Sequence, residues 1–193
     1  MTPNKIAVTG GIGSGKSLFC DILSKMGYPV FSCDEINRAL WQDKDYLHAL
    51  AIAFPDCLSD GAPQKEMLSR KVFSDREARK KLDRIAHPRI MQRLLEAMNA
   101  CERPVFAEVP LLFEGGYEGL FDAVIALRRN QEERIAALCA RDSLSREAAL
   151  ERMQAQFAPD RLEEKNCTII ENEGDSLQLE QKARHALRAL GIL

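Results

Sequence analysis

The sequence lacks the features that mark membrane, secreted or nucleic-acid-binding proteins. No apolar run reaches the length of a membrane-spanning helix. The N-terminus has no basic segment followed by an apolar one, as a secretion signal would. The formal net charge is only -2, so overall charge points to neither nucleic acid nor an acidic membrane as a partner. We therefore expect a cytoplasmic protein in which any anionic ligand is held by local positive groups.

Cysteine pairs of the C-x-x-C type are also missing, although the chain has six cysteines. Most of them fall on apolar faces of expected helices and strands, which favours reduced thiols over the alternatives of disulfides or bound zinc. Repeats and low-complexity tracts are absent as well. With 193 residues and 46% hydrophobic content, the chain can form one sizeable core.

A phosphate-binding loop stands near the N-terminus. Residues 10–17 read Gly-Gly-Ile-Gly-Ser-Gly-Lys-Ser, which fits the P-loop pattern G-x-x-x-x-G-K-[ST]. The apolar run 5–9 predicts a buried strand before the loop, and helical spacing over 17–26 predicts a helix after it. In this motif Lys16 reaches the β- and γ-phosphates, and the Ser17 hydroxyl can bind Mg²⁺. The motif predicts a nucleoside triphosphate ligand, but it does not separate kinases from GTPases or ATPases.

Strand and helix patterns alternate along the rest of the chain. Further strands are expected at 29–32, 104–109, 121–127 and 168–172. We predict an α/β fold of the P-loop NTPase type, in which helices flank a parallel five-stranded sheet. No strand-like run appears between residues 43 and 103. Helices are expected there at 46–54, 65–73, 75–86 and 90–101, with a turn at 60–63, a capping box formed by Ser74 and Glu77, and a helix start at His87-Pro88.

These patterns divide the chain into three parts. The core takes residues 1–34, 104–127 and 161–193, and a helical insertion takes 35–103. Two further helices, expected at 131–141 and 145–157, form a lid over 128–160.

Several charged residues follow the strands whose carboxyl ends bind ligands in parallel sheets. Asp34 is either the N-cap of the next helix or a general base for phosphoryl transfer, and one carboxylate can serve both roles. Glu108 stands where an acid that holds Mg²⁺ would stand, or else it is a solvent-facing residue at a strand end. In the lid, Arg134, Arg141 and Arg152 are either surface residues or inward arginines that neutralise phosphate charge.

In the insertion, His87 is either a structural residue or, with neighbouring arginines, a receptor for an anionic substrate. These arginines are Arg84, Arg89 and Arg93.

Taken together, these residues resemble the dephospho-CoA kinase family across nearly the whole chain. The matching stretches are Thr-Gly-Gly-Ile-Gly-Ser-Gly-Lys-Ser at 9–17, Asp-Glu-Ile at 34–36, Val-Phe-Ser-Asp at 72–75, His-Pro at 87–88, Pro-Leu-Leu-Phe-Glu at 110–114, Arg141 with Asp142, Leu144 with Ser145, Arg152 with Gln156, and Asn172. The loop together with Pro-Leu-Leu-Phe-Glu is specific, whereas neither is specific alone.

The resemblance implies that ATP, with Mg²⁺, donates its γ-phosphate to the ribose 3′-hydroxyl of dephospho-CoA, giving CoA and ADP. It makes Asp34 the base, while Lys16 and Arg141 steady the phosphates. The nucleotide-binding residues that it implies are Gly11, Ile12, Gly13, Ser14, Gly15, Lys16, Ser17, Leu18 and Asn172, the last near the adenine. The acceptor-binding residues are His87, Leu112, Phe113 and Glu114, and the metal-binding residues are Ser17 and Glu108.

The chain departs from the family pattern at two acidic positions. Ser32 stands where the family usually has the first acid of Asp-Ala-Asp, and Glu108 stands near a position that the family usually fills with Asp. Two other readings stay open. One is another small-molecule kinase of the same fold, acting on a nucleoside or nucleotide, and the other is a non-catalytic nucleotide-binding relative.

Overall fold

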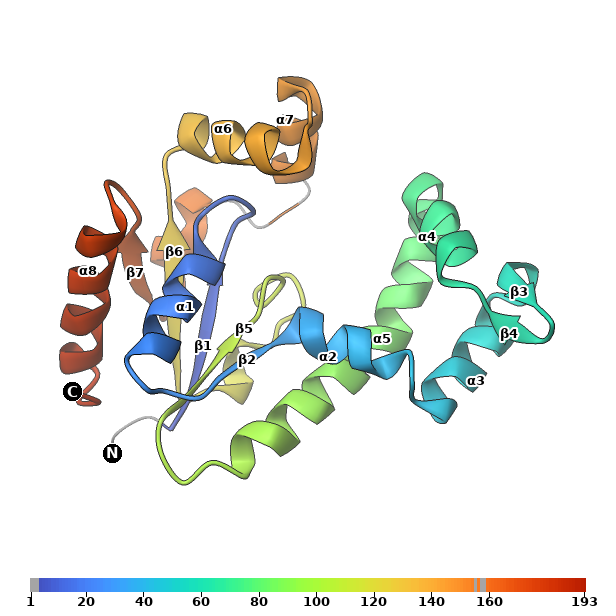
Figure 1. Ribbon diagram of the computed structural model, residues 1–193, viewed down its shortest axis with the longest axis horizontal. Coiled ribbons are helices and arrows are strands. Elements are labelled where there is room, and N and C mark those ends of the chain that lie inside the picture. The colour runs from blue at the N-terminus through green and yellow to red at the C-terminus, as the bar shows by residue number, and fades with distance from the viewer. Residues whose placement is uncertain (1–3, 155, 157–158) are drawn as a thin grey trace. The chain divides into compact units, whose positions relative to one another are not determined.

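The computed structural model describes residues 4–154, 156 and 159–193 (Figure 1). They form two compact units, of which the larger contains the chain up to Phe31 and from Met98 onward. The smaller unit is Ser32–Ala97. The expected lid at 128–160 includes three residues outside this description, namely 155, 157 and 158, and the expected helix at 145–157 includes two of them, 155 and 157.

A five-stranded parallel sheet lies at the centre of the larger unit, as the sequence predicts (Figure 1). Its strands are β1 (Lys5–Gly10), β2 (Val30–Ser32), β5 (Val105–Glu108), β6 (Ala123–Arg128) and β7 (Thr168–Glu171). Their order is β2-β5-β1-β6-β7, so β1 pairs in parallel with β5 on one side and β6 on the other. The chain leaves β1 toward one edge and later returns to the other edge, and this reversal creates the crevice in which such sheets bind ligands.

The apolar sequence of β1 follows from burial on both faces of the sheet. Ile6, Ala7 and Val8 are all fully buried, as parallel strands covered by helices require. The helices α1 (Lys16–Lys25) and α8 (Ser176–Ala189) pack against the strands through side chains that include Phe19 and Leu187. Each such side chain contributes roughly 1.5–3 kcal/mol when fully buried. This packing fixes the carboxyl end of β1, where the glycine-rich loop begins.

The smaller unit is mostly helical but also contains a short hairpin. Its helices are α2 (Cys33–Leu40), α3 (Lys44–Ala53), α4 (Lys65–Ser74) and most of α5 (Arg76–Asn99). The expectation of no strand in this region is wrong, because β3 (Leu58–Ser59) pairs antiparallel with β4 (Ala62–Pro63). Asp60 and Gly61 link them with φ angles of 51° and 77°, as a two-residue hairpin turn requires. Strands of two residues are too short to leave an alternating pattern in the sequence.

Pro88 does not begin a helix, contrary to the prediction. It lies inside α5, which continues from Arg76 to Asn99. A proline inside a helix removes one N–H donor and crowds the preceding turn. Arg89, the residue after Pro88, donates from Nη1 to the carbonyl of Ile85 in that preceding turn at 2.9 Å. The two helices that the sequence pattern predicts are therefore one continuous helix, in which Pro88 removes one backbone hydrogen bond.

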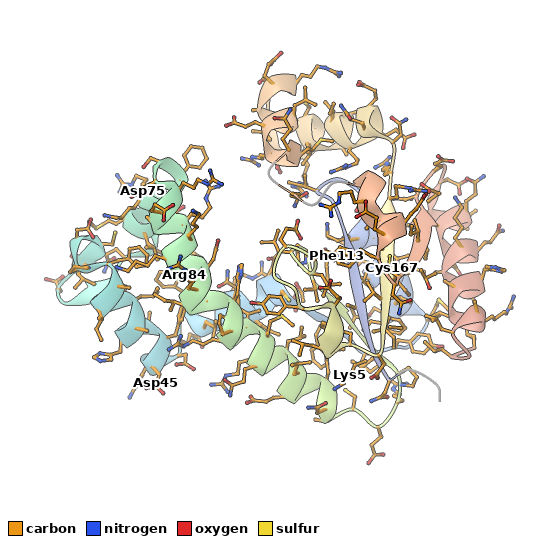
Figure 2. The ribbon with its side chains drawn as sticks, turned by 180° about the vertical axis from the view of Figure 1, so that it is seen from behind. Lys5, Asp45, Asp75, Arg84, Phe113 and Cys167 are labelled. Atoms are coloured by element: carbon orange, nitrogen blue, oxygen red, sulfur yellow. The ribbon has the colours of Figure 1, made fainter. Side chains whose placement is uncertain are left out.

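The cap of α5 is also one residue later than predicted. The Asp75 carboxylate accepts from the backbone N–H groups of Glu77 and Ala78 at 2.8 and 3.1 Å. Ser74 instead donates to carbonyls in the last turn of α4, so it does not form the capping box. Figure 2 labels Asp75 at this junction of α4 and α5. An ionised carboxylate accepts stronger hydrogen bonds from backbone N–H groups than a hydroxyl does, which favours Asp75 at the cap position.

Two helices follow β6 in the larger unit. They are α6 (Gln131–Asp142) and α7 (Arg146–Gln154), and Figure 1 draws them beyond the carboxyl ends of β1 and β6. They pack together through Ile135, Leu138 and Ala149. Short 3₁₀ turns complete the fold at Pro55–Cys57, Glu118–Leu120 and Pro159–Glu164. Within the described part of the chain, no helix has the length and apolar character needed to cross a membrane.

Candidate active site

The glycine-rich loop connects β1 directly to α1. Gly13 and Gly15 have φ angles of 78° and 92°, in the left-handed region that favours glycine. Gly15 is the N-cap of α1, so the first N–H groups of this helix face the loop. Unpaired amides and the helix dipole at this end form a site for an anion.

Lys16 supplies a cation inside this loop. Its ammonium group donates to the carbonyls of Gly10 and Gly11 at 2.9 and 3.2 Å. Lys16 is only 8% exposed, so its charge is largely shielded from water. An ammonium ion in this position interacts strongly with phosphate oxygens that enter the loop.

Asn172, which directly follows the edge strand β7, holds the loop through a hydrogen bond. Its Nδ2 donates to the Ser14 carbonyl at 2.8 Å, and the residue is 6% exposed. A Cβ atom at Gly15 would collide with the same amide, so glycine is required there for space as well as for its φ angle. The structure thus places Asn172 against the loop backbone. The sequence alone placed it in the nucleotide site through the family resemblance.

The peptide groups of Ile12 are held by two residues from the segment expected to be a lid. Arg134 donates from Nε to the Ile12 carbonyl at 2.9 Å, and the Ile12 N–H donates to Oε1 of Gln156 at 2.6 Å. The contact of Gln156 was not predicted, because a single glutamine between helices carries no periodic signal. Only the family resemblance singled out this position.

Ser17 and Glu108 form a pair of oxygen donors at the mouth of the loop. The Ser17 hydroxyl donates to Oε1 of Glu108 at 3.1 Å, which joins the start of α1 to the end of β5. Among the described residues, no group of three or more His, Cys, Asp or Glu side chains forms a metal cluster. The neighbouring Leu18 is 42% exposed on α1.

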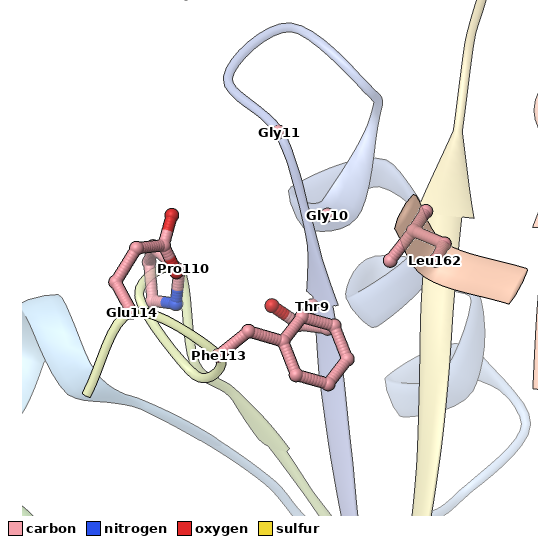
Figure 3. A pocket seen from close by; sticks show the side chains of 7 residues that line it. All are labelled: Thr9, Gly10, Gly11, Pro110, Phe113, Glu114 and Leu162. Atoms are coloured by element: carbon pink, nitrogen blue, oxygen red, sulfur yellow. The ribbon is translucent and has the colours of Figure 1, made fainter. Parts of the chain in front are cut away.

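The Pro-Leu-Leu-Phe-Glu segment follows β5 and lines a small pocket beside the loop. Figure 3 shows the Phe113 ring next to Thr9 at the end of β1, with Leu162 on the other side. Glu114 also lines this pocket, whereas Leu112 is fully buried. Leu112 therefore anchors the segment, and Phe113 and Glu114 are the members that reach the pocket.

Lys165 supports this pocket from outside. Its ammonium group lies 2.8 Å from Oε1 of Glu118 and 5.1 Å from the centre of the Phe113 ring. The hydrogen bond from Lys165 is the main reason that the pKa of Glu118 lies below its ordinary value. Phe113 appears with labels in both Figure 2 and Figure 3.

The three arginines expected in the lid do not behave alike. Arg134 is buried against the loop, but Arg141 is exposed and donates to both carboxylate oxygens of Asp142 at 2.8 and 2.9 Å. Arg152 donates to the same carboxylate at 3.0 Å. The hydrogen bond from Arg141 holds the pKa of Asp142 below its ordinary value. Asp142 therefore forms ion pairs with two of the three arginines, Arg141 and Arg152.

Asp34 and His87 belong to the smaller unit, Ser32–Ala97. Asp34 is exposed in the first turn of α2, and the N-cap of that helix is Ser32, so the expected capping role of Asp34 is wrong. The helix starts two residues earlier than its polar pattern suggests. The imidazole of His87 lies 3.6 Å from Oδ1 of Asp83 within α5.

The parallel sheet, the glycine-rich loop and its lysine define a P-loop nucleoside-triphosphate-binding protein. A family model described as dephospho-CoA kinase matches residues 4–178. The chain belongs to the dephospho-CoA kinase family, and it is accordingly an ATP-dependent kinase.

Curated relatives agree with this assignment. A dephospho-CoA kinase of Thermus thermophilus is 35% identical over 189 residues, covering 97% of this chain and 92% of the relative. The dephospho-CoA kinase of Deinococcus radiodurans is 33% identical over 195 residues, covering 98% of this chain and 94% of the relative.

Solved structures show the same similarity. A crystal structure of a Thermus thermophilus protein matches with a TM-score of 0.84 and 36% identity, covering 98% of each chain. A dephospho-CoA kinase from Campylobacter jejuni matches with a TM-score of 0.71 and 30% identity, covering 97% of this chain and 96% of the other. A gluconokinase from Sinorhizobium meliloti is only 15% identical at a TM-score of 0.54, so its likeness concerns the fold alone.

Proposed function

We propose that the protein transfers the γ-phosphate of ATP to the ribose 3′-hydroxyl of dephospho-CoA, giving CoA and ADP. The observation that carries this proposal is family membership combined with an intact loop in which Lys16 and the start of α1 face the phosphate position. In the reaction the hydroxyl oxygen forms a bond to the γ-phosphorus, and the bond from that phosphorus to the β–γ bridging oxygen breaks. The proton of the hydroxyl leaves to a base on the enzyme.

Lys16 and Arg141 are the residues that we assign to phosphate charge. Lys16 lies inside the loop and exchanges its carbonyl contacts for phosphate oxygens when ATP enters. Arg141 is held by Asp142 on an exposed part of α6, from which a long side chain can turn toward the nucleotide. Fixed positive groups at the transferring phosphoryl group stabilise the charge that develops there. We assign residues 128–160 as the lid that carries Arg141.

Asp34 is our candidate for the base. It is an exposed carboxylate that makes no side-chain cap for its own helix, so its oxygens are available to accept a proton. A general base of this kind contributes about 10²–10⁴-fold to the rate. Since Ser32 takes the place of the family's first acid, Asp34 carries this role without a second carboxylate two residues before it.

The acceptor is assigned to two segments. Phe113 and Glu114 line the pocket beside the loop, and Leu112 anchors them from the core. His87 and the remainder of residues 35–103 form the proposed acceptor domain. This helical region carries arginines suited to the phosphates of dephospho-CoA.

Magnesium is the metal that the residues at the loop fit. The hydroxyl of Ser17 and the carboxylate of Glu108 are hard oxygen donors that lie 3.1 Å apart. Mg²⁺ binds to proteins through one or two such groups and completes its shell with water and substrate phosphates. When bound, the ion neutralises phosphate charge, and these two residues would hold it.

The remaining expectations concern the surroundings of the enzyme. ATP and dephospho-CoA are its proposed partners, with no role for nucleic acid or a membrane, and a cytoplasmic location fits six free cysteines. All six lie in the described part of the chain.

A coupled assay of ADP formation tests the proposal. Purified protein is given ATP, Mg²⁺ and one acceptor from a panel of dephospho-CoA, adenosine, AMP and gluconate. We expect turnover with dephospho-CoA and a product that carries the new phosphate on the 3′-hydroxyl, read by mass spectrometry and phosphorus NMR.

Lys16→Ala is the matched control in this assay, since it removes the loop cation and should slow turnover at least about 10²-fold. Equal activity of the variant would point to a contaminating kinase. Turnover with another acceptor and none with dephospho-CoA would overturn the acceptor assignment. No specific observation in the structure favours such an acceptor.

A further inference from the structure

Arg134 is the most deeply buried arginine among the described residues. It lies in the first turns of α6 and is 4% exposed. Its Nε donates to the Ile12 carbonyl at 2.9 Å, and its Nη2 occupies the space that a Cβ atom at Gly11 would need. The backbone of Arg134 also approaches Gly13, with its carbonyl oxygen 3.0 Å from the position of a Cβ there. The residue therefore covers the tip of the phosphate-binding loop.

Among the side chains of residues 4–154, 156 and 161–193, the charge of Arg134 has no carboxylate partner, and its terminal nitrogens donate to none of these residues. The other arginines of this region behave differently, since each forms an ion pair: Arg128, Arg129, Arg141, Arg146 and Arg152. Burial lowers the pKa of Arg134 from its ordinary value, yet a guanidinium remains protonated in proteins. A buried cation with one hydrogen bond to a neutral carbonyl destabilises the protein unless an anion approaches it.

The phosphates of a nucleotide are the anion that this position can meet. They bind in the loop whose outer side Arg134 covers, and electrostatic attraction is strong where water is largely excluded. We propose that Arg134 is a positioning residue for the nucleotide: it fixes the loop at Ile12, and its buried charge is compensated when ATP or ADP binds. This inference rests on the proposed function only in taking a nucleoside polyphosphate as the ligand.

The proposal links nucleotide affinity to the charge of this side chain. Without nucleotide, the uncompensated charge opposes folding, whereas with nucleotide the same charge favours the complex. Any ligand that binds the folded protein raises its stability by an amount that depends on its affinity. A neutral residue at position 134 should therefore weaken nucleotide binding. Without nucleotide, the protein with the neutral residue should be at least as stable as a variant that carries another charged residue at this position.

Two substitutions separate the charge from the hydrogen bond. Arg134→Gln keeps a donor for the Ile12 carbonyl but removes the charge, and Arg134→Lys keeps the charge without the planar fork. Arg146→Gln is the matched control, because Arg146 is an exposed arginine of the adjacent helix that pairs with Glu132. ADP binding to each full-length protein is measured by calorimetry in the absence of any acceptor. KM for ATP, KM for dephospho-CoA and the melting temperature without ligand are measured alongside.

We expect Arg134→Gln to bind ADP at least about tenfold more weakly than wild type, since charge-assisted contacts to phosphate are among the stronger ones. Arg134→Lys and Arg146→Gln should stay within about threefold, as expected when the charge is retained or lies at the surface. KM for ATP should rise in Arg134→Gln while KM for dephospho-CoA remains near the wild-type value.

Other outcomes overturn the proposal. A loss of ADP affinity below about tenfold in Arg134→Gln shows that the charge does not contribute to binding. A tenfold change corresponds to about 1.4 kcal/mol, which is about the least that a hydrogen bond to a charged group contributes. An equal loss in Arg134→Lys assigns the effect to shape instead. Failure of Arg134→Gln to fold, alone or together with Arg134→Lys, makes the residue structural. Because no acceptor is present, a wrong assignment of dephospho-CoA would leave the ADP result unchanged.

Discussion

The hydroxyl of Ser17 donates to the carboxylate of Glu108 at 3.1 Å, although the two residues are 91 positions apart in the chain. Ser17 lies in the first turn of α1, and Glu108 is the last residue of β5. Parallel pairing of β5 with β1 brings Glu108 opposite Val8, two residues before the loop. The sheet therefore positions a carboxylate beside the hydroxyl without any local sequence relation between them.

Replacing Glu108 with Gln should raise the Mg²⁺ concentration required for half-maximal activity. The amide keeps the shape of the side chain but has no charge, so the metal should bind about tenfold more weakly or worse. Glu102→Gln is the matched control, since Glu102 is exposed shortly before the same strand. Activity is titrated with Mg²⁺ at constant ATP. Identical midpoints for Glu108→Gln and wild type would remove Glu108 from the metal site.

Replacing Asp34 with Asn should slow turnover at least about 10²-fold while both substrates still bind. An amide cannot accept the proton of the ribose hydroxyl. Glu35→Gln is a close control, because both acids lie in the first turn of α2 and each loses a comparable interaction with the helix dipole. Melting temperatures of the two variants should therefore agree. If Asp34→Asn keeps the kcat of wild type, another group is the base.

Replacing Arg141 with Ala should lower kcat about 10²-fold or more and change KM for dephospho-CoA less, as expected for a charge that acts on the transferring phosphoryl group. The exposed pair of Arg141 with Asp142 adds little stability, so the fold should survive. Arg146→Ala serves as the control on the neighbouring helix. A raised KM for dephospho-CoA with intact kcat would instead place Arg141 in the acceptor site.

Asp122 should make the stability of the folded protein depend on pH in the acidic range. Its Oδ2 accepts from the backbone N–H groups of Lys5 and Asn4 at 2.8 and 2.9 Å, and chiefly the Lys5 contact lowers its pKa below the ordinary value of 3.8. A lowered pKa in the folded state stabilises the protein above pH 3.8, and this contribution is lost as pH falls through the folded pKa.

Wild type should therefore melt at a higher temperature than Asp122→Asn near neutral pH, and the difference should shrink as the solution is acidified. Asp21→Asn controls for general charge effects, since Asp21 is an exposed acid on α1. Melting curves followed by circular dichroism at several pH values provide the measurement. A difference that stays constant down to strongly acidic pH would show that the Asp122 contacts do not titrate as described.

The fold was predictable where a sequence pattern extends over many residues and the residues that define an element are neighbours in the chain. The apolar run of β1, the glycines after it and the helical spacing of α1 together determined both the element types and the loop. The pattern failed at Pro88, since proline is common at helix starts but here lies within α5. It also failed at the hairpin of β3 and β4, whose strands are too short for periodicity to register.

The place of a residue in the candidate site was predictable where a motif assigns it, as for Lys16 and Ser17 in the loop, and their roles toward ATP and Mg²⁺ stay predictions. Contacts between distant residues were not, because they depend on how the elements pack. The three arginines expected in the lid show this limit. Their spacing predicts a shared helix face for Arg134 and Arg141, but only the structure distinguishes the buried residue on the loop from the exposed one that pairs with Asp142.

The hydrogen bond from Asn172 to Ser14 has a consequence for the order in which the protein matures on the ribosome. Its two partners are separated by 158 positions, so the loop is synthesised long before the amide that supports its backbone. Domains fold from the N-terminus during synthesis at roughly 5–20 residues per second. The loop is therefore synthesised roughly 8–32 seconds before Asn172. We expect nascent chains that end before Asn172 to carry the motif without retaining nucleotide.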